Sequence, residues 1–426
     1  MVEPRQVETS DGVAIHVPEE ERPPVRRLGP RDWARENLFN TWYNTALTLV
    51  FGALLAVASF RAIRFVFVSA RWEIIRVNLT SLLVGLFPRP ELWRVWVALY
   101  LGGAVFAAAI GMAVRTVAEP EGGEAPRPAK APWTERLRRA WPVLLLLAVL
   151  LSLSGALVPV LLVASLLGVV LGGFLAGRRA PMALTRWAWA GGLAAVGGML
   201  LVVVGFGGVP WDDWGGLMLT LFLAVGSIVL SFPLGLAAAL GRRSRLPALR
   251  IVSIGYIELL RGVPLITVLF MSALTIRFFL PRGMDVPGLV VRAMIGLMLF
   301  TGAYVGEIVR GGLQGVPKGQ IEAAQAVGLS PLKVTRLVVL PQALRSVIPA
   351  LVGQFISLFK DTSLVVIIGL TDLLFFAQAI TSQPQFLAQG LQAETLAFAA
   401  FVYWVFAYTM SKESQRIERR LGLGER

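Results

Sequence analysis

Ten apolar runs constrain this chain more than any other feature. Each is close to the roughly 20 residues that a helix needs to cross a hydrocarbon core about 30 Å thick. They lie at 43–60, 94–114, 142–156, 157–177, 187–206, 215–239, 263–280, 289–309, 347–369 and 395–411. Apolar residues make up 56% of the chain, and a soluble monomer rarely exposes so much apolar surface. The sequence predicts an all-α polytopic membrane protein with about eight to ten transmembrane helices.

The basic residues indicate which loops face the cytoplasm. The chain has 40 Lys and Arg against 26 Asp and Glu, a net charge of +14. These residues gather in short loops between apolar runs, as in cytoplasmic loops of membrane proteins, so we expect a lipid bilayer and no nucleic acid as the partner. Two such loops carry Arg178, Arg179 and Arg186, then Arg242, Arg243, Arg245 and Arg250. The acidic Trp-Asp-Asp-Trp at 211–214, between them, suits the outer interface.

Sidedness decides how residues 142–177 cross the membrane. The basic residues of the polar linker 115–140 and of the Arg178 loop indicate that both lie on the cytoplasmic side, so an even number of crossings separates them. The sequence therefore predicts two short spans that turn near Ser154 and Gly155.

The loop at 61–93 conflicts with this scheme because its arginines would lie outside. They are Arg61, Arg64, Arg71, Arg76, Arg89 and Arg94. The 71–87 portion has apolar residues at helical spacing, and we interpret it as an amphipathic helix along the membrane surface.

No catalytic or metal-binding constellation stands out. The chain has no cysteine, and its single histidine, His16, lies in the charged, proline-rich tail 1–40. No Gly-x-x-x-x-Gly-Lys-Ser/Thr phosphate loop occurs. We expect a chain that is not an enzyme, with no catalytic residue, no metal site and no bound cofactor.

The segment 311–346 has the pattern of a helical hairpin. Pro317 can open a first helix that continues over 320–327, and Gly328 stands where a left-handed stop is needed. Ser330 and Pro331 then suit the N-cap and first turn of a second helix.

We expect Pro341 to end this second helix. The hairpin offers a small face and charged rim residues, namely Ala323, Ala324 and Ala326, with Glu322, Lys333 and Arg336. The residues of the hairpin alone allow two interpretations. It could be a docking surface for a partner, or it could be a solvated connector between two spans.

Glu322-Ala323-Ala324, Gly328 and Leu340-Pro341 are similar to the EAA signature of bacterial ABC importer permeases. The resemblance, to the polar amino acid branch, covers about 215–411. Further matches are Glu258, Arg261 to Leu265, Tyr304, Glu307, Arg310, Gly311, Gly312, Pro317, Gly319, Gln320, Gln342, Ala343, Arg345, Pro349 and Lys360 to Leu364. It implies a five-helix type I permease core whose loop seats in a groove of a cytoplasmic ATPase. The coupling residues that it implies are Gln320, Glu322, Ala323, Ala324, Gly328, Leu329, Ser330 and Pro331.

The first 210 residues depart from the minimal permeases, and such an extension resembles the M-type subunit of general L-amino acid permeases. The resemblance implies ATP-driven import of amino acids, with broad L-amino acid specificity, at a bacterial inner membrane. It implies three partners: a Q-type second permease, a periplasmic amino acid-binding protein, and an ABC ATPase dimer that binds ATP and Mg. Two alternatives are an ion-coupled secondary transporter, although no internal repeat is evident, and a membrane scaffold that recruits a soluble partner.

The domains that we expect follow from these patterns. They are a polar cytoplasmic tail at 1–40, a membrane extension at 41–210 with the linker 115–140, a permease core at 211–412 with the coupling loop 311–346, and a basic cytoplasmic tail at 413–426.

Polar residues interrupt the span at 347–369, at Lys360, Asp361, Thr362 and Ser363. A charge at mid-membrane costs about 2.5–3.5 kcal/mol on insertion scales, so it normally faces a bundle interior or an aqueous cavity. Lys and Asp could complement the carboxylate and ammonium of an amino acid, or they could form a structural ion pair. The resemblance favours a substrate pathway.

Two further pairs of opposite charge stand three residues apart, at helical spacing. We expect Glu258 to pair with Arg261 and Glu307 to pair with Arg310, as stabilisers of the fold or of a gate.

Overall fold

The computed structural model describes residues 7–8, 14–15, 29–118, 133–185, 187–205, 207–387 and 389–420. Our expectations for His16, Arg186, residues 119–132 of the linker and residues 421–426 lie outside these ranges. The chain forms two compact units, Met1–Ala70 and Arg71–Arg426, and each is described by itself.

The first unit contains one long apolar helix. Strands β1 (Val7–Glu8) and β2 (Ala14–Ile15) pair antiparallel, and α1 (Pro30–Asn37) precedes α2 (Trp42–Arg64). The Thr41 hydroxyl caps α2 by accepting the Asn44 N–H at 3.4 Å. A π-helical turn at Phe65–Ser69 extends the helix, and the whole is long and apolar enough to cross a membrane. The predicted span at 43–60 is confirmed as a helix.

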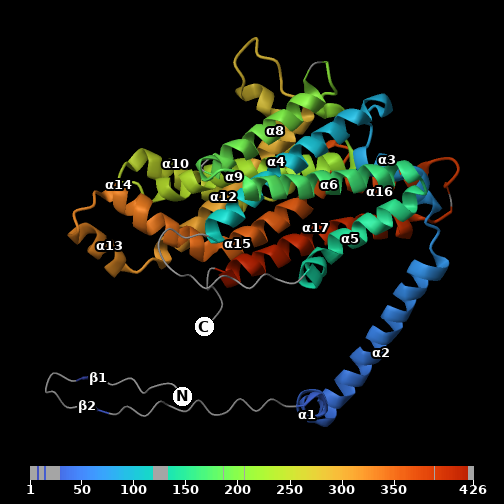
Figure 1. Ribbon diagram of the computed structural model, residues 1–426, viewed down its shortest axis with the longest axis horizontal. Coiled ribbons are helices and arrows are strands. Elements are labelled where there is room, and N and C mark those ends of the chain that lie inside the picture. Colours follow the sequence, from blue (N-terminus) through green and yellow to red (C-terminus); the bar gives the residue numbers. More distant parts are fainter. Residues whose placement is uncertain are drawn as a thin grey trace. The chain divides into compact units, whose positions relative to one another are not determined.

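The second unit is a helical bundle (Figure 1). Its helices are α3 (Glu73–Val84), α4 (Leu92–Ala118), α5 (Trp133–Ser154), α6 (Leu157–Arg179), α7 (Met182–Thr185), α8 (Ala188–Val204), α9 (Gly216–Arg242), α10 (Pro247–Gly262), α11 (Leu265–Thr275), α12 (Leu289–Gly315), α13 (Lys318–Ala326), α14 (Pro331–Lys333), α15 (Leu340–Asp361), α16 (Leu373–Ala379) and α17 (Gln392–Arg420). Short 3₁₀ helices lie at Arg89–Glu91, Trp211–Asp213, Ile276–Phe279, Thr362–Ile368 and Ile380–Ser382, and a π-helix lies at Val334–Val339.

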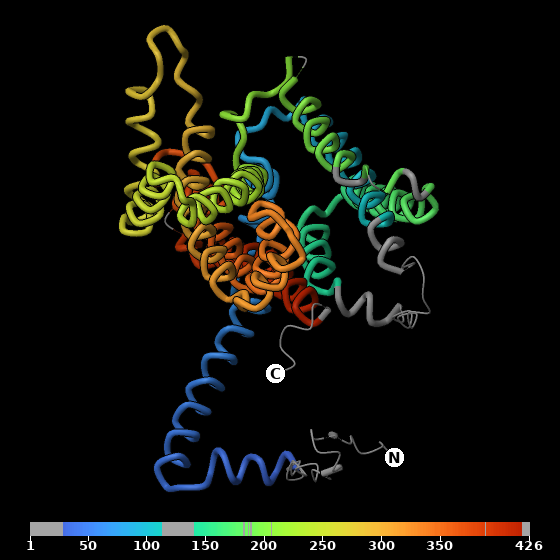
Figure 2. Tube along the Cα trace, turned by 90° about the vertical axis from the view of Figure 1, so that its left-hand side faces the viewer, coloured from blue at the N-terminus to red at the C-terminus, as the bar shows by residue number. Residues whose placement is uncertain are grey.

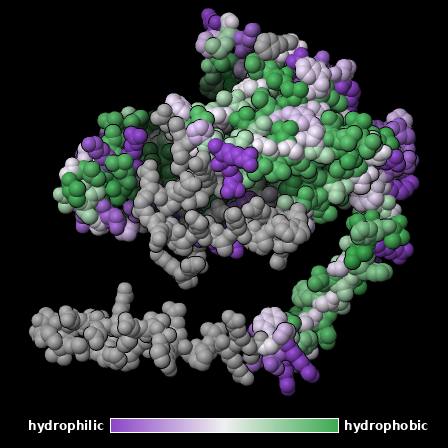
Figure 3. Space-filling view, in the orientation of Figure 1, coloured by the Kyte–Doolittle hydropathy of each residue, from purple (hydrophilic) through white to green (hydrophobic). Residues whose placement is uncertain are grey.

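The all-α membrane fold is confirmed. Across the described part of the chain, seven helices are long and apolar enough to cross a membrane, or eight if one bent pair counts as a single span. Apolar residues cover much of the bundle face drawn in Figure 3. Helix α17 continues to Arg420, so the described part of the predicted tail at 413–426 is helical.

Glycines bring two helices of the N-terminal extension together. A Cβ added at Gly173 of α6 would lie 2.4 Å from the Ala104 carbonyl oxygen of α4, and one at Gly177 would lie 2.0 Å from that of Ala108. Helices α4 and α6 therefore run parallel in close contact. The chain must return once between two parallel helices, and α5 is the helix that lies between them in the sequence. It turns into α6 at Gly155 (φ +59°), so two helices, α5 and α6, separate the linker from the Arg178 loop, as predicted. Figure 2 shows α6 and α8 on one side of the bundle, away from α12 and α15.

The position of α3 corrects our expectation of a surface helix. Its apolar residues Ile74, Ile75 and Leu82 are fully buried, and they join a core that includes residues of α5, α9, α16 and α17. A Cβ at Gly216 would lie 2.4 Å from the Leu82 carbonyl oxygen, so the C-terminal end of α3 abuts the start of α9. The amphipathic pattern is real, but the apolar face packs on protein.

This packing also gives partners to arginines of the loop 61–93 that conflicted with the charge scheme. Arg71 donates to the side-chain and backbone oxygens of Gln389, both at 3.1 Å. Arg94 donates to Glu91 at 2.6 Å and to the Val202 carbonyl at 2.9 Å. Local acceptors therefore hold these charges at the end of the bundle where α9 begins.

The predicted single span at 263–280 is wrong. Helix α10 ends at Gly262, Val263 is extended, and α11 begins after Pro264 at an angle of 111° to α10. The residue before a proline is disfavoured in helical geometry, which breaks the helix here. Helix α11 has 11 residues, about 16 Å at 1.5 Å per residue, and is too short to cross alone.

Candidate functional site

The predicted hairpin stands at one end of the bundle, where α13 and α14 project (Figure 1). Its turn is fixed by two backbone hydrogen bonds: Gly328 N–H donates to the Gln325 carbonyl at 2.9 Å, and Leu329 N–H donates to that of Ala324 at 3.2 Å. Gly328 has φ +82°. This is the Schellman arrangement, in which the left-handed residue needs no side chain. The predicted left-handed stop is confirmed.

The hairpin packs on the bundle through only part of its surface. Ala324 is buried in an apolar core with Val309, Val334 and Ala343. This corrects our grouping of the three alanines into one docking face, because Ala324 supports the hairpin. The other implied coupling residues are exposed, except for half-buried Leu329: they are Gln320, Glu322, Ala323, Gly328, Ser330 and Pro331.

Large apolar side chains also stand exposed here. Val327 is 82% exposed, and Leu332 and Leu337 are also exposed. Exposed apolar residues rimmed by charge mark a surface suited to a protein partner. Ser330 occupies the N-cap position as predicted, although its side chain makes no capping hydrogen bond.

Pro341 does not end the second helix, contrary to our expectation. The π-helix Val334–Val339 joins α14 to α15, and Leu340 N–H donates to the Thr335 carbonyl five residues back. Pro341 lies in the first turn of α15. The wider π-helical turn before it accommodates the proline without a break in the helix. The hairpin is thus continuous with a membrane-spanning helix.

Four charged residues join three helices near this end. Glu307 on α12 pairs with Arg310, as predicted, with Arg310 Nε donating at 2.9 Å. The same carboxylate lies 3.5 Å from Arg242 of α9 and 3.5 Å from Arg261 of α10. Glu307 therefore connects the ends of α9, α10 and α12.

The predicted pair of Glu258 with Arg261 is wrong. Glu258 pairs with Arg242 at 2.9 Å, whereas Arg261 faces Glu307 and lies 5.6 Å from the Tyr304 ring centroid. Spacing along one helix cannot reveal an arginine on another. Sequence reasoning treated Arg242 as an orientation signal only, and nothing local marks it as a partner of two carboxylates.

Lys360 stands at the end of a polar stripe on α15. The stripe consists of exposed polar or small residues three or four positions apart, namely Gln342, Ser346, Ala350, Gly353, Ser357 and Lys360. A lysine and serines on one face of a spanning helix are poorly matched to lipid tails. The face suits an aqueous path or a second subunit, and helical spacing alone could have found it.

The four polar residues at 360–363 are divided by the structure. Lys360 is exposed and Asp361 half-buried, and within the described ranges they form no ion pair with each other. Thr362 is fully buried, with its hydroxyl donating to the Phe359 carbonyl at 2.7 Å, so it points into the fold. Ser363 is half-buried.

A polar network that sequence reasoning missed lies beyond α15. Asp372 is fully buried and accepts hydrogen bonds from the Phe375 N–H at 2.9 Å and the Tyr403 hydroxyl at 3.3 Å. The Leu373 N–H donates to Thr220 of α9 at 3.2 Å. Burial raises the pKa of the Asp372 carboxyl to about 6. The network ties the turn before α16 to α9 and α17.

A membrane bundle with a polar face on one spanning helix, and an exposed hairpin continuous with that helix, is the arrangement expected of a transport permease. Comparison with known proteins agrees: a family described as "Binding-protein-dependent transport system inner membrane component" matches residues 231–421. Two relatives match over nearly their whole length. "Inner membrane amino-acid ABC transporter permease protein YhdY" of Escherichia coli is 35% identical over 92% of this chain and 93% of its own. "Glutamate/glutamine/aspartate/asparagine transport system permease protein BztC" of Rhodobacter capsulatus is 34% identical over 93% of this chain and 95% of its own.

The chain belongs to the family of amino-acid ABC transporter permeases. It is a multi-pass inner-membrane transport subunit, as the resemblance predicted, and the family's task is transport without an enzymatic activity of its own. "Probable glutamine ABC transporter permease protein GlnP" of Bacillus subtilis is 38% identical over 92% of its own length but only 49% of this chain. The long extension is therefore shared with the first two relatives and exceeds the third.

Proposed function

We propose that this subunit forms one half of the translocation path of a bacterial amino acid importer and transmits motion from a partner ATPase through its hairpin. The observation that carries the proposal is the fixed turn at Gly328 with exposed Val327 and Leu332 beside it, continuous through α15 with the polar stripe. Coupling of ATP hydrolysis to transport requires a continuous structural connection between the ATPase-docking surface and the substrate path, and α15 provides that connection.

ATP and Mg would be bound by the partner ATPase dimer, because this chain contains no phosphate loop. A periplasmic amino acid-binding protein would deliver the substrate, and a Q-type permease would supply the second half of the path. The assignment as the M-type subunit rests on the long N-terminal extension, which two relatives share over nearly their whole length.

We assign Lys360 to the path, as a complement to the substrate carboxylate, with Asp361 and Ser363 beside it. Lys360 is exposed at the end of the polar stripe, and a carboxylate paired with it would offset the cost of a charge in the membrane. A carboxylate is common to all amino acids, which fits broad L-amino acid specificity. Thr362 is left out of the path because its hydroxyl bonds within the fold.

The test is reconstitution of the subunit in proteoliposomes with its ATPase, second permease and binding protein. We expect uptake of labelled amino acids that requires ATP, and ATP hydrolysis that rises when the binding protein is loaded. Uptake that follows an imposed ion gradient without ATP would favour a secondary transporter. An ATPase that co-purifies but shows no stimulation and no uptake would favour a scaffold.

A further inference from the structure

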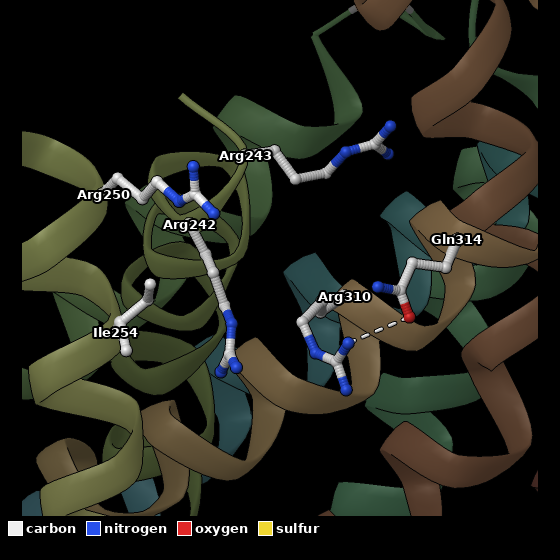
Figure 4. Close-up of a pocket in the computed structure, with 6 residues that line it drawn as sticks. All are labelled: Arg242, Arg243, Arg250, Ile254, Arg310 and Gln314. Carbon is white, nitrogen blue, oxygen red and sulfur yellow. Dashed lines mark hydrogen bonds between the residues drawn. The ribbon is translucent and has the colours of Figure 1, made fainter. Parts of the chain in front are cut away.

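A pocket of about 410 Å³ lies between the ends of α9, α10 and α12 on the hairpin side of the bundle. Four of its six lining residues are arginines. The lining, here named the arginine pocket, is Arg242, Arg243, Arg250, Ile254, Arg310 and Gln314. Figure 4 shows the four guanidinium groups around the space between α10 and α12. The basic loop places this pocket at the cytoplasmic membrane surface.

The charges in the pocket are only partly compensated. Arg242 and Arg310 pair with Glu258 and Glu307. Arg243 donates to a neutral acceptor, the Leu313 carbonyl, at 3.0 Å. The Arg250 guanidinium has no hydrogen bond or ion pair within the described residues. Two arginines thus remain without a carboxylate, which favours an anion as the ligand.

The helix that supplies Arg250 also carries an exposed aliphatic face. Leu249, Ile251, Val252 and Leu259 of α10 are each more than half exposed. Ile254 continues the apolar surface into the pocket wall. A ligand that combines a phosphate with hydrocarbon chains would satisfy both features, whereas a free phosphate would satisfy only the arginines.

We propose that the arginine pocket binds the phosphate headgroup of an anionic phospholipid from the cytoplasmic leaflet. Arg250 and Arg243 contact the phosphate, since the other two arginines are held by carboxylates. The acyl chains lie along the aliphatic face of α10. Basic pockets between membrane helices on the cytoplasmic side bind anionic headgroups by this charge complementarity. The lipid bridges α10 to the ends of α9 and α12.

The experiment titrates the delipidated, detergent-solubilised full-length subunit with phosphatidylglycerol or phosphatidylcholine, with bound lipid counted by native mass spectrometry. We expect phosphatidylglycerol to bind at least tenfold more tightly than phosphatidylcholine, and the preference to weaken as salt rises. Arg250→Gln should lower phosphatidylglycerol affinity about tenfold, and Arg243→Gln/Arg250→Gln should abolish the preference. Arg245→Gln is the matched control, because Arg245 is exposed in the same loop but does not line the pocket.

Arg250→Gln keeps the test valid if the double variant fails to fold, because the Arg250 guanidinium loses no hydrogen bond or ion pair within the described part of the chain. An unchanged lipid preference in Arg250→Gln and the double variant would overturn the proposal. Displacement of the lipid by millimolar inorganic phosphate would reassign the pocket to a free anion, and loss of lipid on adding the ATPase would reassign it to a protein contact. The measurement requires no transport, so its failure is separate from failure of the proposed function.

Discussion

The Arg242 guanidinium at the end of α9 lies 3.5 Å from the Glu307 carboxylate on α12. Arg261 of α10 reaches the same carboxylate oxygen at 3.5 Å, and Arg310 holds the other oxygen. The Glu307 side chain is 22% exposed, so solvent screens these interactions only in part. One carboxylate therefore balances three arginines from three helices.

Glu307→Gln should destabilise the subunit because it leaves the three guanidinium groups without their shared anion. We expect a loss of about 1–3 kcal/mol in the free energy of unfolding, the usual range for a partly buried charged hydrogen bond. Thermal unfolding in detergent measures it. Glu258→Gln is the control, since Glu258 is 56% exposed and pairs with one arginine, and it should cost less than about 1 kcal/mol. Equal losses in both variants would contradict the hub role of Glu307.

Gly328→Val should uncouple ATP hydrolysis from transport while the subunit still inserts into the membrane. A side chain at φ +82° costs about 1–2 kcal/mol, which distorts the turn that fixes α13 against α14. Stimulated ATPase activity and uptake in proteoliposomes are the measurements. Gly319→Ala is the control, because a Cβ there meets nothing within 4 Å and Gly319 lies inside α13. Normal uptake by a well-expressed Gly328→Val subunit would contradict a role of Gly328 in coupling.

Lys360→Ala should weaken transport without lowering the amount of folded subunit, because Lys360 has no ion-pair partner among the described residues. If the lysine meets the substrate carboxylate, we expect KM for amino acids to rise about tenfold, equivalent to about 1.4 kcal/mol. Competition by charged and neutral amino acids, in this variant and in Asp361→Asn, shows whether selectivity shifts. Unchanged rate and selectivity in both variants would favour a structural role. Lys412→Met, in the C-terminal third of α17, is the control.

Gly177→Ala should loosen the N-terminal extension. The added Cβ would lie 2.0 Å from the Ala108 carbonyl oxygen, and overpacking of this kind typically costs 1–3 kcal/mol. Gly172→Ala in the same helix meets nothing within 4 Å, so helix propensity should make it neutral or stabilising by up to about 1 kcal/mol. Thermal unfolding of the two variants should move in opposite directions. A Gly177→Ala protein as stable as Gly172→Ala would refute the close contact of α4 with α6.

The stability of the subunit should depend on pH through Asp372. Burial raises the pKa of this carboxyl from 3.8 to about 6, so the folded state favours the neutral form. The stabilisation is fully present below about pH 4 and is lost as pH rises through 6, by about 2–3 kcal/mol in total. Asp372→Asn keeps an acceptor for the cap and removes the ionisation. Unfolding measured from pH 4 to 7 should therefore be flatter in Asp372→Asn, and parallel curves would count against this assignment.

The class of fold and most of the hairpin could be predicted from the amino-acid sequence. Apolar run length predicts membrane helices because the bilayer thickness sets it, and Gly328 predicts the turn because only glycine accepts that backbone geometry at little cost. The turn at Gly155 followed from loop charges. Each of these signals is local, and so it can be read along the chain.

The partners that the side chains contact depend on how the helices pack in three dimensions. Helical spacing suggested Glu258 with Arg261, but α9 brings Arg242 closer to Glu258. The apolar face of α3 could have contacted lipid or protein, and in the structure it packs against α9 and α17. Pro341 does not break the helix because the preceding π-helical turn accommodates it. Contacts between distant segments depend on how helices pack, and the pattern within one helix contains no information about its neighbour.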